Sequence, residues 1–104
     1  MTTTNKGNTM NAKQVRDLLN TGSTDTLVGL NDWAVNTVRE YARANGYDAA
    51  ELVAEEAARI TAGQMNLDAY MTCSRAGSYR RLNRKVRVAV YAVFATRVAL
   101  ADRF

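Results

Sequence analysis

The stretch from Val88 to Ala101, VAVYAVFATRVALA, is apolar except at Thr96 and Arg97. A helix built from it is apolar on nearly every side, which is typical of a helix at the centre of a domain or of a seam between two copies of a chain. Lys85 to Val90 alternates polar and apolar residues and is rich in valine, which would also suit a strand. We favour a helix, because nothing interrupts the run up to Phe104 and roughly 25 residues are too many for one strand.

Polar residues that can cap helices, and glycines that can end them, divide the rest of the chain. Asn11 with Gln14, and Asp48 with Glu51, have the three-residue spacing of a capping box. Single cap residues, and glycines where a left-handed residue would end a helix, complete the pattern: Asn31, Asn66, Ser78, Gly22, Gly46, Gly63 and Gly77. These signals predict an all-α, single-domain bundle of about five helices, near residues 12–20, 32–45, 49–62, 67–76 and 79–102.

The predicted organisation is a flexible N-terminal arm, residues 1–9, followed by one helical domain, residues 10–104. Residues 86–101 should form a long, largely buried central helix. Apolar residues at helical spacing predict the core: Ala34, Val38, Tyr41, Leu52, Val53, Ile60, Leu67, Met71, Val90, Val93, Phe94 and Val98. A loop, Thr21–Gly29, should join the first two helices. A helix-turn-helix pair is the alternative there, but that motif uses three or four connecting residues, and about ten are too many.

Composition excludes several classes of function. Hydrophobic residues make up 47% of the 104 residues and charged residues 23%, which is ordinary for a globular protein. No apolar stretch reaches about 18 residues and Met1–Thr9 has no signal core, so we expect no signal peptide, no membrane span and a cytoplasmic location. The single cysteine, Cys73, fits a reducing compartment. Without histidine the chain has no Ser-His-Asp triad and no histidine-containing zinc site, so we expect a non-catalytic protein without metal or cofactor.

Charge is segregated along the chain. Residues 47–72 carry a net charge of −4 and residues 73–104 a net charge of +7. Thirteen residues from position 75 to position 87 contain six cations and no acid. Three of the arginines have the i, i+4, i+7 spacing of one helical stripe, and arginine forks suit phosphates and carboxylates. The predicted binding residues are Arg75, Tyr79, Arg80, Arg81, Arg84, Lys85 and Arg87.

Three interpretations of this basic face remain open. It could contact nucleic-acid phosphates, with Tyr79 and Tyr91 stacking on bases. It could dock on an acidic protein surface, as in a small regulator or inhibitor of the phage or plasmid type, an association that rests on size and composition alone. It could instead be neutralised within the domain if Glu51, Glu55 and Glu56 face it.

The apolar C-terminal stretch also predicts a possible homodimer. Its alternating three- and four-residue spacing is that of a coiled-coil seam: Tyr79, Leu82, Val86, Ala89, Val93, Thr96 and Leu100.

Two other kinds of site are not supported by the sequence. Cys73 and Arg80 are one residue too far apart for a cysteine-phosphatase loop, so Cys73 is interpreted as a small hydrophobe. The glutamates of residues 51–56 lack the histidines of a di-iron site.

Overall fold

A computed structural model describes residues 10–72 and 82–102 of the chain. Every regular element in these ranges is a helix, and helices hold 83% of their residues, which confirms the predicted all-α class. The helices are α2 (Ala12–Thr21), α3 (Thr24–Asn45), α4 (Ala49–Ala62), α5 (Leu67–Thr72) and α6 (Arg84–Ala101). None of the described helices combines the length and mean hydropathy that a bilayer span requires.

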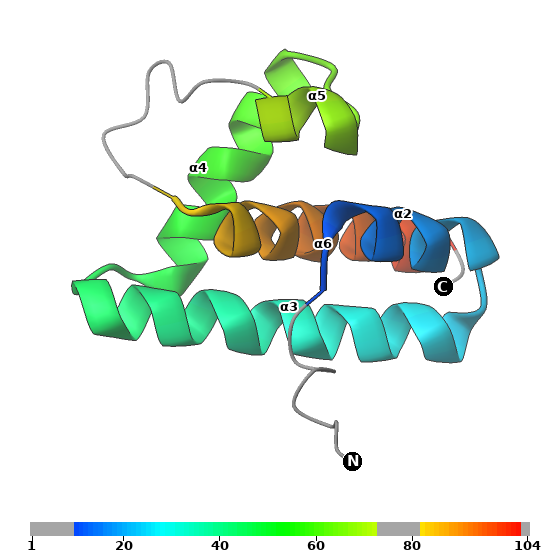
Figure 1. Cartoon of the computed structure of the whole chain (residues 1–104), viewed down its shortest axis with the longest axis horizontal. Helices are drawn as coiled ribbons and strands as arrows, with labels where there is room; N and C mark the ends of the chain where they lie inside the picture. The colour runs from blue at the N-terminus through cyan, green and yellow to red at the C-terminus, as the bar shows by residue number, and fades with distance from the viewer. Residues whose placement is uncertain (1–9, 73–81, 103–104) are drawn as a thin grey trace.

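The bundle is organised around α6, which contacts all four of the other helices. Figure 1 shows α6 lying antiparallel to α3, with α2 against this pair, α4 crossing it and α5 at the far end of α4. The hydroxyl of Thr96 on α6 donates a hydrogen bond to Asn31 Oδ1 on α3 at 3.0 Å, which fixes the two long helices against each other. The prediction of a C-terminal helix at the centre of the fold is confirmed.

Burial along α6 departs from the prediction at its C-terminal end. Residues 86–101 were predicted to be largely buried. In the structure, seven residues of its first four turns are buried: Val86, Val88, Ala89, Val90, Ala92, Val93 and Thr96. The last turn reaches the surface, and the side chain of Val98 is 52% exposed. Val98 was predicted to be in the core, but one side of it borders an open groove.

The remaining core prediction is largely correct. Eight of the twelve predicted residues are buried: Ala34, Val38, Leu52, Val53, Ile60, Leu67, Val90 and Val93. Tyr41, Met71 and Phe94 are half-buried. The coiled-coil seam is occupied within the chain, since Val86, Ala89, Val93 and Thr96 lie in its own core. The seam therefore gives no support to the predicted homodimer.

The connection between the first two helices is shorter than predicted. Ser23 caps α3 by accepting a hydrogen bond from the Thr26 amide at 3.3 Å, so α3 begins at Thr24 and the predicted loop 21–29 is mostly helix. Asn31 is consequently an interior residue of α3 and not its cap. Only Gly22 and Ser23 join α2 to α3, and α2 runs back along α3 (Figure 1). This is an αα-hairpin and not a helix-turn-helix pair, whose helices cross at about 90–120°.

Local capping is otherwise as the sequence predicts, with two exceptions. Asn11 forms the full capping box with Gln14, and the side chains of Asp48 and Asn66 each accept a backbone hydrogen bond. Gly22 and Gly46 have the predicted left-handed conformation. Gly63 does not, because the left-handed residue there is Gln64. The last helix begins at Arg84, capped by Asn83, and not at residue 79; Ser78 and Gly77 lie outside the described residues.

Candidate functional site

The predicted basic face is only partly within the described structure. Arg75, Tyr79, Arg80 and Arg81 lie outside the described residues. Arg84 and Lys85 are exposed in the first turn of α6, and Arg87 is half-buried. The predicted stripe required one helix through positions 80, 84 and 87. Since α6 begins at Arg84, only the last two of these positions share it.

Arg87 has a structural role between α5 and α6. Its Nη1 donates a hydrogen bond to the backbone carbonyl of Tyr70 at 3.1 Å. Its Cζ also lies 5.4 Å from the centroid of the Tyr70 ring, a cation–π distance. A carbonyl at the end of the short helix α5 thereby gains a charged donor. Arg87 therefore links α6 to α5, and its side chain is half-buried.

Tyr70 also joins α5 to the acidic helix α4. Its hydroxyl donates a 2.7 Å hydrogen bond to Glu56 Oε1, and the side chain of Glu56 is almost completely buried. Arg59, one turn further along α4, places Nε 3.9 Å from the same oxygen. Three glutamates would have to face the basic helix if it were neutralised within the domain. Of these, Glu56 turns inward to this cluster, while Glu51 and Glu55 are exposed. The Glu56–Tyr70–Arg87 connection therefore stabilises the packing of α4, α5 and α6.

Stability should fall in alkaline solution because of Tyr70. Burial, followed by the hydrogen bond to Glu56 and the charge of that carboxylate, raises the pKa of Tyr70 above its ordinary value of about 10. The unfolded chain therefore loses this proton first, so the stabilisation is complete below pH of about 10 and is lost as the pH rises above it. Tyr70→Phe should be less stable than the wild type at pH 8, and the difference should shrink above pH of about 10.

Urea unfolding of the wild type and of Tyr70→Phe, from pH 8 to above pH of about 10, measures this difference in stability. Burial also raises the pKa of Tyr91, so Tyr91→Phe is the matched control. Tyr91 donates no hydrogen bond to Glu56, and its variant should lose less stability at pH 8 than Tyr70→Phe. A pH-independent difference between the wild type and Tyr70→Phe would contradict the assignment.

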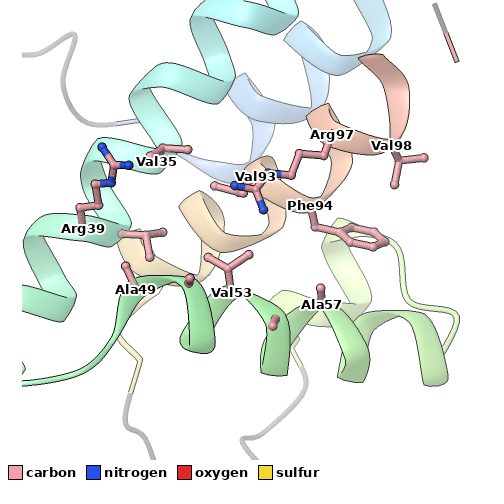
Figure 2. Close-up of a pocket in the computed structure, with 12 residues that line it drawn as sticks. Val35, Arg39, Ala49, Val53, Ala57, Val93, Phe94, Arg97 and Val98 are labelled. Carbon is pink, nitrogen blue, oxygen red and sulfur yellow. The ribbon is translucent and has the colours of Figure 1, made fainter. Parts of the chain in front are cut away.

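A groove of about 340 Å³ lies between α3, α4 and α6 (Figure 2). Small side chains of α4 form one wall, because alanines leave space between α4 and the other two helices. Valines and Phe94 form the floor and the opposite wall. The apolar lining residues are Val35, Val38, Ala49, Ala50, Val53, Ala54, Ala57, Val93, Phe94 and Val98.

Two arginines are the charged residues of this groove. Arg39 comes from α3 and Arg97 from α6, and both are exposed (Figure 2). Within the described part of the chain, neither guanidinium group has an ion-pair or hydrogen-bond partner. No acid occurs among the described residues that line the groove. The groove is therefore apolar inside and positively charged at its rim.

The sequence did not indicate this site. Arg39 and Arg97 are 58 positions apart, and only the antiparallel packing of α3 on α6 brings them to one groove. The one available signal was Arg97 itself, a cation in an apolar run.

No group of three potential metal ligands occurs among residues 10–72 and 82–102. Comparisons with models of protein families, with curated proteins and with solved structures found no match to this chain.

Proposed function

We propose that this chain is a non-catalytic binding protein that contacts nucleic-acid phosphates through its basic segment, residues 75–85. The observation that carries the proposal is the charge segregation. The segment holds five cations and no acid in eleven residues, and the final 32 residues carry a net charge of +7. Arginine and lysine at this density are the usual electrostatic footprint of phosphate binding.

Arg84 and Lys85 support the proposal from the described part of the segment. Both are exposed, and neither has an ion-pair partner among the described residues. They occupy the first turn of α6, which contains no acid. Cations are unfavourable there because the helix dipole is positive at this end, and a bound phosphate would relieve the repulsion. Arg87 is left out of the proposed site because Tyr70 holds it.

The salt dependence of binding tests the proposal. Arg84→Ala/Lys85→Ala should weaken binding to a generic DNA duplex or single strand. Between about 50 and 200 mM salt, it should lower the slope of log affinity against log salt by roughly two, one for each lost phosphate contact. Fluorescence anisotropy, recorded at several salt concentrations, measures both the affinity and its salt dependence. Folding should be nearly unchanged, because exposed substitutions usually alter stability by less than about 0.5 kcal/mol each.

Arg39→Ala/Arg97→Ala is the control, since it removes the same net charge from exposed positions elsewhere. Its salt slope should match that of the wild type. If both double variants bind nucleic acid as the wild type does, the nucleic-acid proposal is wrong. An acidic protein partner for the basic segment then becomes the better hypothesis.

A further inference from the structure

We propose that the groove between α3, α4 and α6 is a docking site for an acidic amphipathic helix of a partner protein. This inference is independent of the proposed nucleic-acid contact, because it rests on other residues at another part of α6. Arg97 follows Arg84 by thirteen positions, which corresponds to about 20 Å along a helix.

The apolar surface of the groove extends beyond its interior. Val98, at one edge, is 52% exposed and is one of two large hydrophobic side chains exposed among the described residues. A volume of about 340 Å³ is at the lower end of the usual range for small-molecule pockets, about 300–1,000 Å³. A ligand that fills only this volume contacts Val98 from the side of the groove and leaves the rest of its exposed surface in water. A helix that inserts one or two apolar side chains and continues over Val98 covers both.

The wall from α4 favours a helix as the occupant. Ala50 and Ala54 are exposed, lie one turn apart on α4 and line the groove. Ala57, further along α4, also lines it (Figure 2). These short side chains allow the backbone of a second helix to approach closely. An amphipathic helix in an apolar groove is a common mode of peptide recognition, with anchors at i, i+3, i+4 and i+7.

The charge of the rim specifies the partner's chemistry. Arg39 and Arg97 flank the apolar floor, and the lining residues that the structure describes include no acidic side chain to neutralise them. A guanidinium group can bind a carboxylate through two parallel hydrogen bonds. Arginine is also one of the residue types that contribute most to binding at protein interfaces. The complementary surface is a row of leucines or similar residues flanked by glutamates or aspartates.

Charge exchange tests the inference. The probes are a panel of helical peptides with leucines at i, i+3, i+4 and i+7 and glutamates beside them, and a twin panel with lysine in place of glutamate. The wild type should bind members of the glutamate panel at least about tenfold more tightly than their lysine twins, because like charges at an interface are strongly unfavourable. Arg39→Glu/Arg97→Glu should reverse this preference. Titration calorimetry gives the affinities.

Two further variants separate a specific groove from a general charge effect. Arg84→Glu/Lys85→Glu changes the net charge equally at the other end of α6 and should keep the preference for glutamate peptides. Ala54→Glu, on the exposed wall of the groove, should weaken glutamate-peptide binding although both arginines remain. Circular dichroism confirms that each variant is folded.

Three results would overturn the inference. One is the absence of binding by every glutamate peptide, and another is an unchanged preference in Arg39→Glu/Arg97→Glu. The third is that no peptide binds, while decanoate binds saturably to the wild type and not to Arg39→Glu/Arg97→Glu. The groove would then be a site for a small amphiphilic anion. Retained peptide binding by Arg84→Ala/Lys85→Ala, together with lost nucleic-acid binding, would support both proposals separately.

Discussion

Replacing Glu56 with alanine should lower the free energy of unfolding by about 3–5 kcal/mol, the usual cost of breaking a buried charged pair. The carboxylate is 3% exposed, accepts the Tyr70 hydroxyl at 2.7 Å and faces Arg59 Nε at 3.9 Å. The substitution removes the acceptor of a buried hydroxyl and the anion beside a largely buried cation. Both losses fall at the junction of α4 and α5, so these helices should lose protection from hydrogen exchange before α3 does.

Urea unfolding at neutral pH measures this loss. Glu56→Gln keeps an acceptor for Tyr70 while removing the charge, so it should lose less stability than Glu56→Ala. Glu40→Ala removes an exposed glutamate from α3 and should change stability by less than about 0.5 kcal/mol. Equal effects of Glu56→Ala and Glu40→Ala would show that the cluster does not stabilise the fold.

Leu27→Ala should lower the free energy of unfolding by about 2–5 kcal/mol, as expected for a leucine removed from a core. Leu27 has 0% exposure and lies in the first turn of α3, in the segment for which the sequence predicts a loop. If Leu27 lay in an exposed loop, the same substitution would change the free energy of unfolding only slightly. Thermal or urea unfolding therefore distinguishes a helix that begins at Thr24 from one that begins after Asn31.

The neighbouring positions provide matched controls. Val28 is 43% exposed, so Val28→Ala should change stability by less than about 0.5 kcal/mol. Gly29 lies in the helix without a positive φ, and a Cβ there would meet no atom within 4 Å. Gly29→Ala should therefore raise stability by about 0.5–1 kcal/mol. If Leu27→Ala lowered the free energy of unfolding as little as Val28→Ala, the result would contradict a helix α3 that begins at Thr24.

Helix boundaries were predictable where the signal is local. The bounds of α4 agree with the prediction at both ends, and α2 differs by one residue, because a cap and a glycine mark each of them. The beginning of α3 was not predictable in this way, since both Ser23 and Asn31 are good cap residues. Burial of Leu27 and Leu30 favours the earlier one, and that burial depends on helices distant in the sequence.

The candidate sites show the same limit of local information. Spacing placed Arg84 and Arg87 on one stripe, but it could not predict that Tyr70, seventeen positions earlier, would bind Arg87. Neither Arg39 nor Arg97 was predicted to be a binding residue, because both lie outside the dense basic segment. Net charge was predictable from residues alone; which cations remain exposed depends on tertiary packing.

The pairing of α3 with α6 also has a consequence for synthesis. The Asn31–Thr96 hydrogen bond spans 65 residues, so α3 emerges from the ribosome well before the helix that buries it. At about 5–20 residues per second, α3 waits roughly 3–13 seconds for its partner. During that interval the apolar side of α3 that later meets α6 can be covered only by α2, α4 or a chaperone. If a ribosome is stalled before α6 is translated, proteases should therefore cleave its nascent chain readily. Ribosome-associated chaperones should also bind that nascent chain.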